Sequence, residues 1–184
     1  DAAVTIDLAT GGASGGHAEG DTIIDIEQLV GSSHDDTLSG DTADNRLFGE
    51  NGSDVLFGVD GRDTLSGGEG ADTLHGGTNH DDLYGGADND ILFGNSGNDI
   101  LFGNDGDDYL SGYNGSDLLN GGEGNDSLRG AANADIFVFN EDFGNDLIYD
   151  FNLSEAGEYI DLSNVAAIES FSDLTANHLS QSGA

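Results

Sequence analysis

Basic residues are nearly absent from this chain of 184 residues. Its only basic side chains are Arg46, Arg62 and Arg129, whereas 37 residues are Asp or Glu, so the formal net charge is −34. Nucleic acids and anionic membranes are bound through Lys and Arg at phosphate groups. The composition therefore argues against either of them as a direct partner.

Cysteine and proline are also absent, whereas glycine occurs 31 times. Without cysteine the chain has neither disulfides nor thiolate metal sites. No apolar run approaches the roughly 18 residues that a membrane helix needs, and residues 1–30 contain no basic segment followed by an apolar signal core. We expect a soluble chain, although so acidic and glycine-rich a composition is also typical of disorder.

A nine-residue repeat argues against disorder. It begins at Gly31 and continues to Val138 as twelve units without insertion or deletion. Position one is always Gly, position six is Asp except at Asn45, and position eight is Leu except at Phe137. Low-complexity sequence does not keep three columns in phase over such a length, so the repeat predicts a regular solenoid.

Each column of the repeat indicates a structural role. Gly at position one, and Gly, Asn or Asp at position four in ten of the twelve units, tolerate positive φ and predict that the first six residues form a turn. An apolar residue between two variable ones predicts a short strand over the last three. Two units would make one coil, so we predict an all-β, parallel β-roll of about six coils around one line of leucines.

The repeat resembles the GGxGxDxUx nonapeptide of the RTX (repeats-in-toxin, haemolysin-type calcium-binding) proteins. The resemblance implies a calcium-bound parallel β-roll and type I secretion through a C-terminal signal. It also implies a secreted, extracellular or cell-surface location. The implied partners are the type I secretion machinery and an attached or docked catalytic or adhesive domain.

The carboxylate spacing independently favours calcium. With two units per coil, alternate position-six residues stack into two columns about one strand spacing apart, where two unit charges repel by about 3.5 kcal/mol at an effective dielectric of 20. Ca²⁺ accepts six to eight oxygens in flexible geometry, and glycine turns expose carbonyls that complete the shell. We expect about seven to ten ions.

The candidate metal ligands form two sets, the position-six residues and the turn glycines. They are Asp36, Asn45, Asp54, Asp63, Asp72, Asp81, Asp90, Asp99, Asp108, Asp117, Asp126 and Asp135, with Gly49, Gly52, Gly67, Gly70, Gly76, Gly85, Gly94, Gly97, Gly103, Gly106, Gly112, Gly115, Gly121 and Gly124.

The flanks differ from the array, which divides the chain into residues 1–30, 31–138 and 139–184. Residues 1–30 alternate apolar and polar residues and predict strands that cover the first coil. Residues 139–184 resemble the C-terminal cap of RTX modules, and their abrupt end suggests truncation. We expect a short helix capped by Ser172. Asp146 and Asp150 fit either a further calcium site or turn capping.

Other chemistry has little support. The five histidines (His17, His34, His75, His80 and His178) match no catalytic motif and are expected to be exposed or in turns, and no acidic loop has the Glu of an EF-hand. No catalytic constellation is present, so we expect no enzyme activity from this chain.

The outward positions of the predicted strands contain several large apolar residues. They are Phe48, Phe57, Tyr84, Ile91, Phe93, Ile100 and Phe102. They predict either ordinary exposed surface or a docking patch centred on Ile91, Phe93, Ile100 and Phe102.

Two functions follow. The first is a module that folds on Ca²⁺ outside the cell and supports secretion and stability of an attached enzyme, toxin or adhesin. The alternative is an extracellular polysaccharide- or ligand-binding module of an adhesin or epimerase-like enzyme. A polyanionic sugar would require a basic face, and the three arginines occupy different repeat positions, from which we expect that they do not align.

Overall fold

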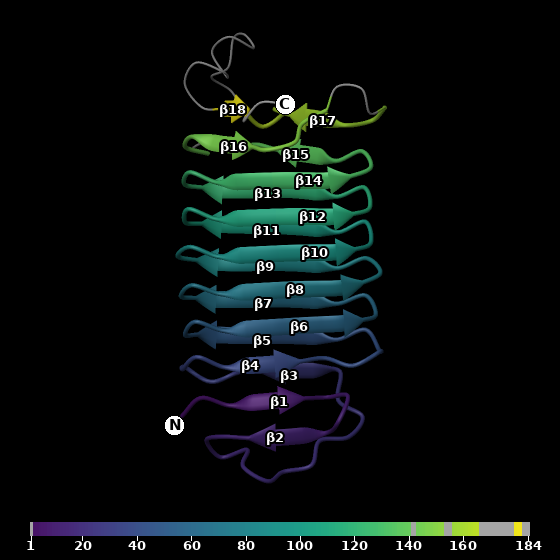
Figure 1. The fold of residues 1–184 in the computed structure, drawn as a ribbon. Helices are drawn as coiled ribbons and strands as arrows, with labels where there is room; N and C mark the ends of the chain where they lie inside the picture. Colours follow the sequence, from purple (N-terminus) through teal and green to yellow (C-terminus); the bar gives the residue numbers. More distant parts are fainter. Residues whose placement is uncertain (1, 141–142, 153–155, 166–178, 182–184) are drawn as a thin grey trace.

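The computed structural model describes residues 2–140, 143–152, 156–165 and 179–181. In this part of the chain all regular structure is β-strand, arranged in two facing sheets (Figure 1). The chain crosses to the other sheet after each repeat, so strands two apart in sequence pair in parallel through the array. The predicted all-β parallel β-roll is confirmed.

The strands of the two sheets alternate along the chain from β3 onward. The ten-stranded sheet contains β1 (Thr5–Asp7), β2 (Gly12–Ser14), β4 (Thr37–Ser39), β6 (Val55–Asp60), β8 (Thr73–Thr78), β10 (Ile91–Ser96), β12 (Tyr109–Asn114), β14 (Ser127–Ala132), β16 (Asp146–Ile148) and β18 (Leu179–Gln181). The eight-stranded sheet contains β3 (Gln28–Val30), β5 (Arg46–Asn51), β7 (Thr64–Glu69), β9 (Asp82–Ala87), β11 (Ile100–Asp105), β13 (Leu118–Glu123), β15 (Ile136–Val138) and β17 (Tyr159–Asp161).

The core is the predicted single row of position-eight side chains. Leu92 pairs with Leu74 on one side and Leu110 on the other, and all three are fully buried. The row contains Leu38, Leu47, Leu56, Leu65, Leu74, Leu83, Leu92, Leu101, Leu110, Leu119, Leu128 and Phe137. Such a core is only one side chain wide, so much of the order must come from the turns.

The strands are longer than predicted. From β5 to β14 each covers six residues, because positions one to three of a repeat continue the strand that begins at position seven of the preceding repeat. In β6, for example, Val55 and Leu56 are followed by Gly58 and Val59 in the same strand. The expectation that the first six residues form a turn was therefore wrong, and the turn is confined to positions four to six.

The left-handed residues also differ from the prediction. None of the twelve position-one glycines, all of which the structure describes, has a φ in the left-handed region. Most residues at position two do have a left-handed φ, including Val59 (φ 87°) and Tyr113 (φ 72°). Position four is left-handed at most repeats, as expected, for example at Gly52 and Asn79. Position one requires glycine for space, because a Cβ on Gly94 would stand 2.5 Å from Oδ2 of Asp99.

The flanking strands extend both sheets. β1 pairs in parallel with β4 and β3 with β5, so the N-terminal segment covers the first coil, while β2 lies antiparallel on the outer edge of β1. Residues 21–27 form no strand, with Thr22 making one isolated bridge to Gly12. The helix expected at Ser172 lies outside the described residues, and the last described segment, Leu179–Gln181, is strand β18.

Candidate metal centre

The position-six residues stack in two columns, one at each edge of the roll. Asp99 N–H donates to Oδ1 of Asp117 in the next coil at 2.8 Å, and Asp81 N–H donates to Oδ1 of Asp99 at 2.9 Å. The same bond occurs at every step of both columns within the array, with distances of 2.7–2.9 Å. The position-six residues therefore lie where the repeat predicted them, one above another.

One oxygen of most column carboxylates has no hydrogen-bond partner. The Oδ2 atoms that are buried without a partner belong to Asp54, Asp63, Asp72, Asp81, Asp90, Asp99, Asp108, Asp117, Asp126 and Asp146. Each of these residues is at most 2 % exposed. A buried charged oxygen without a partner carries a large desolvation cost, so a column of them is a candidate cation site.

Backbone carbonyl oxygens also lie along the stacked turns, some of them close to an Oδ2. A Cβ on Gly76 would stand 2.6 Å from Oδ2 of Asp81 and 2.9 Å from the carbonyl oxygen of Gly94. The carbonyl of Gly52 points at Gly70 in the coil above, where a Cβ would collide with it. Within the described residues no group of three or more acidic or histidine side chains could hold a metal, so these carbonyls must complete any shell. Carboxylates together with carbonyls are a donor set that fits Ca²⁺.

Burial raises the pKa of the column carboxyls. The pKa of Asp81 and of Asp90 is raised to about 8, and that of Asp72, Asp108 and Asp117 to about 7, because loss of solvent disfavours the charged form. The N–H bond to Oδ1 opposes this shift, and neighbouring column charges add to it. A cation would replace the proton that these groups otherwise retain near neutral pH.

Asn45 is the exception in its column. Its Oδ1 accepts the N–H of Asp41 at 2.7 Å and stands beside Gly40 where Oδ2 of Asp54 stands beside Gly49, so its Nδ2 takes the place of an Oδ1 and is buried without a partner. At the N-terminal end of the other column, Oδ1 of Asp36 accepts the N–H of Val4 and Oδ2 accepts the N–H of Ser32. Both end turns thus have fewer free oxygens than the central ones.

A second set of bonds between coils, which the sequence analysis missed, is made at several position-five residues, one residue before the column carboxylates. Oδ1 of Asn98 at position five accepts the N–H of Ser116, and Nδ1 of His80 accepts the N–H of Asn98 at 2.8 Å. Asp107 accepts the N–H of Asn125 in the other column. The frequent Asp and Asn at position five could have indicated these bonds, which align neighbouring turns.

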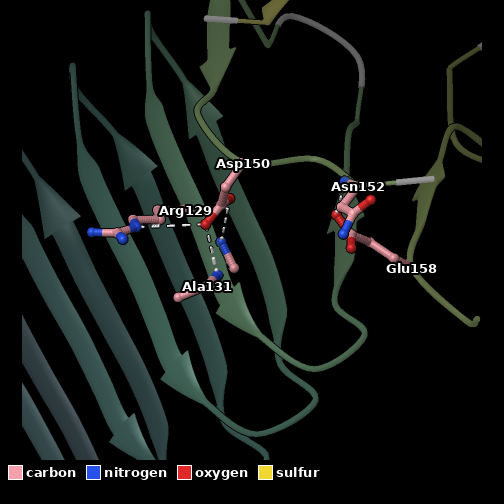
Figure 2. Close-up of polar contacts among 6 residues, drawn as sticks. Arg129, Ala131, Asp150, Asn152 and Glu158 are labelled. Atoms are coloured by element: carbon pink, nitrogen blue, oxygen red, sulfur yellow. Dashed lines mark hydrogen bonds and ion pairs between the residues drawn. The ribbon is translucent and has the colours of Figure 1, made fainter. Parts of the chain in front are cut away.

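The acidic residues of the C-terminal flank have different roles. Asp146 joins the column, whereas Asp150 accepts the N–H groups of Gly130 (3.1 Å) and Ala131 (2.9 Å) and pairs with Arg129 at 3.5 Å (Figure 2). Both oxygens of Asp150 are therefore engaged, which identifies it as a capping residue. Beside it, Asn152 N–H donates to Oε1 of Glu158 (Figure 2).

Two of the three arginines line the same cavity. Arg129 pairs with Asp150, whereas Arg46 and Arg62 line one cavity of about 270 Å³ together with His80. The cavity is also lined by Asp44, Asn45, Asp63, Thr64 and Asp82. These aspartates offset the arginine charges, and no basic face results.

The expected docking patch does not exist as one surface. Ile91 and Phe93 lie on β10, and Ile100 and Phe102 lie on β11 of the opposite sheet. The outward rings instead stack along each sheet, as in Tyr84–Phe102 at 5.5 Å.

The stack on the ten-stranded sheet includes a histidine. His75 is held between Phe57 (5.0 Å) and Phe93 (4.9 Å), and burial lowers its pKa. It is half-buried rather than exposed as predicted.

Two facing parallel sheets with a column of buried aspartates at each edge define a calcium-binding β-roll. The family model for the RTX calcium-binding nonapeptide repeat (4 copies) matches residues 30–65, 57–92, 84–119, 93–128 and 111–148. These matches span well over half of the chain, which belongs to this family. No curated protein matches the chain significantly, and the described residues contain no helix able to cross a membrane.

Proposed function

We propose that this chain is a calcium-dependent folding module that supports the secretion and stability of an attached enzyme, toxin or adhesin domain. The observation that carries the proposal is the set of buried Oδ2 atoms without partners in both columns. A chain with this much buried negative charge is stable only when cations or protons neutralise it.

The column residues would hold the ions. All gaps between stacked turns except the one at Asn45 offer a carboxylate from each coil, together with backbone carbonyls such as those of Gly52 in a turn and Gly94 in β10. Calcium, when bound, supplies the positive charge that the chain lacks, and its flexible coordination suits a mixed shell better than the strict octahedron of Mg²⁺. Filling of the gaps couples metal binding to folding.

This coupling suits export. Below micromolar calcium, as in cytosol, the columns hold no calcium and the chain remains largely unfolded, which favours passage through a narrow secretion channel. At millimolar calcium outside the cell it folds, and the roll then stabilises whatever domain it is joined to. Membership of the RTX family supports type I secretion as the route.

Circular dichroism during a calcium titration tests the proposal. We expect a disordered spectrum in excess chelator and a cooperative transition to β-structure between micromolar and millimolar calcium. Magnesium at the same concentrations, with matched ionic strength, should produce much less β-structure because it prefers strict octahedral geometry. A β-rich spectrum that persists in excess chelator at neutral pH would contradict calcium-dependent folding.

A further inference from the structure

The aspartate column of the ten-stranded sheet continues beyond the last repeat. Asp126 N–H donates to Oδ1 of Asp146 at 2.8 Å. The same bond joins the residues at all the other steps of the column, although Asp126 and Asp146 are 20 residues apart in sequence instead of 18. Gly144, Asn145 and Asp146 repeat the tripeptide of residues 124–126 in the coil below. A thirteenth turn is therefore present outside the regular array.

This turn reproduces the contacts of the repeat turns. The carbonyl of Gly124 faces Gly144, which has a left-handed φ of 64° and no room for a Cβ. Asn145 N–H donates to Oδ1 of Asn125, which continues the position-five bonds. The turn thus stacks on its neighbour as a repeat turn does.

The two extra residues are accommodated without displacing the turn. Phe139 and Phe143 are both buried, and their rings pack at 5.1 Å. After the turn the normal register resumes, since Leu128 pairs with Ile148. The longer connection therefore places Asp146 at the same height as a position-six residue.

Like most carboxylates of the column, Asp146 has one buried oxygen that makes no hydrogen bond. The residue is 1 % exposed, and its Oδ2 is buried without a hydrogen-bond partner, as is Oδ2 of Asp126. Asp150, four residues later, differs because its carboxylate already accepts two N–H groups and pairs with Arg129. Of these two residues, only Asp146 has a buried oxygen available to a cation.

We propose that Asp126 and Asp146 hold a further calcium ion between the turns of residues 124–126 and 144–146, with the carbonyl of Gly124 as an additional oxygen. The inference rests on the proposed function and extends it. With Asp146 included, this column has seven members and six gaps, instead of the six members and five gaps of the array alone. The ion fastens the C-terminal segment to the roll.

The test compares Asp146→Asn with Asp150→Asn in the complete chain. An Asn at 146 keeps one side-chain oxygen, as Asn45 does in its own column, but loses the negative charge of the proposed ligand. An Asn at 150 removes the same charge from a residue whose oxygens are already engaged. Native mass spectrometry in a calcium series counts the ions bound to each protein.

We expect Asp146→Asn to bind one calcium ion fewer than the parent chain, and Asp150→Asn to bind the same number. Equal counts for all three proteins at every calcium concentration overturn this site alone, whereas a parent chain that binds no calcium overturns the proposed function as well. If Asp146→Asn does not fold, anomalous scattering from parent crystals grown in calcium decides. A peak between Asp126 and Asp146 supports the site, and its absence beside occupied array gaps overturns it.

Discussion

Asp99 and Asp117 lie one coil apart and are joined by a bond from the backbone N–H of Asp99 to Oδ1 of Asp117, while Oδ2 of both residues is buried without a partner. One oxygen of each carboxylate thus aligns adjacent turns, and the other remains available to a cation. We therefore predict that the same residue serves both folding and metal binding.

Asp99→Ala and Leu101→Ala separate metal binding from packing. Leu101 is fully buried, and its truncation should cost about 2–5 kcal/mol whatever the calcium concentration. Asp99→Ala should instead raise the calcium concentration needed to fold, so that high calcium largely restores its stability through the remaining sites. Thermal melts of both variants across a calcium series measure the difference.

Asp105→Ala is the matched control for charge, because Asp105 is exposed on the same coil and outside the column. It should leave the calcium dependence nearly unchanged. If Asp99→Ala and Leu101→Ala respond to calcium identically, the position-six carboxylate is not a ligand.

Asn45→Asp should strengthen calcium binding at the N-terminal end of its column. The substitution replaces a buried N–H donor without a partner by a carboxylate oxygen. Isothermal titration calorimetry should show tighter binding at this end. Asn114→Asp, which adds the same charge at an exposed position, should not tighten binding. Equal titration curves for Asn45→Asp and the parent chain would mean that this gap holds no ion.

Val59→Gly should stabilise the calcium-bound roll by about 0.5–1 kcal/mol. Val59 has a φ of 87°, which costs a β-branched residue roughly 1–2 kcal/mol, and the greater freedom of glycine in the unfolded chain offsets part of the gain. Gly68 and Gly77 occupy the same repeat position. Val55→Gly, in the same strand, should destabilise. A lower melting temperature for Val59→Gly in saturating calcium would contradict the backbone argument.

Without metal, the roll should become more stable as the pH falls. The raised pKa values of Asp81 and Asp90, about 8 against 3.8 for the ordinary group, mean that the folded chain binds more protons than the unfolded one. The free energy of unfolding therefore increases as the pH is lowered from about 8 to about 4. Circular dichroism of metal-free protein at pH 8 and pH 5 should show more β-structure at pH 5, and an equal or smaller β-signal there would contradict this linkage.

The repeat alone predicted the two sheets, the leucine row and both aspartate columns, because a side-chain period of nine and a coil of two units fix which residues stack. It predicted the left-handed conformation at position four but not the one at position two, since position two is occupied by Val59 and Tyr113 as well as by glycine. The role of Asp146 was left open because two additional residues break the spacing, and only the structure shows that its turn stacks on the turn of Asp126.

Anomalous scattering from crystals grown in calcium tests the central claim most directly, because it locates each ion beside the oxygens that hold it. We expect about seven to ten ions within the array, each near a buried Oδ2 of the two columns and at about 2.3–2.6 Å from its oxygen ligands. Fewer than about four ions between stacked turns, or ions confined to exposed carboxylates, would contradict the account, because most gaps in the two columns would then be neutralised without calcium.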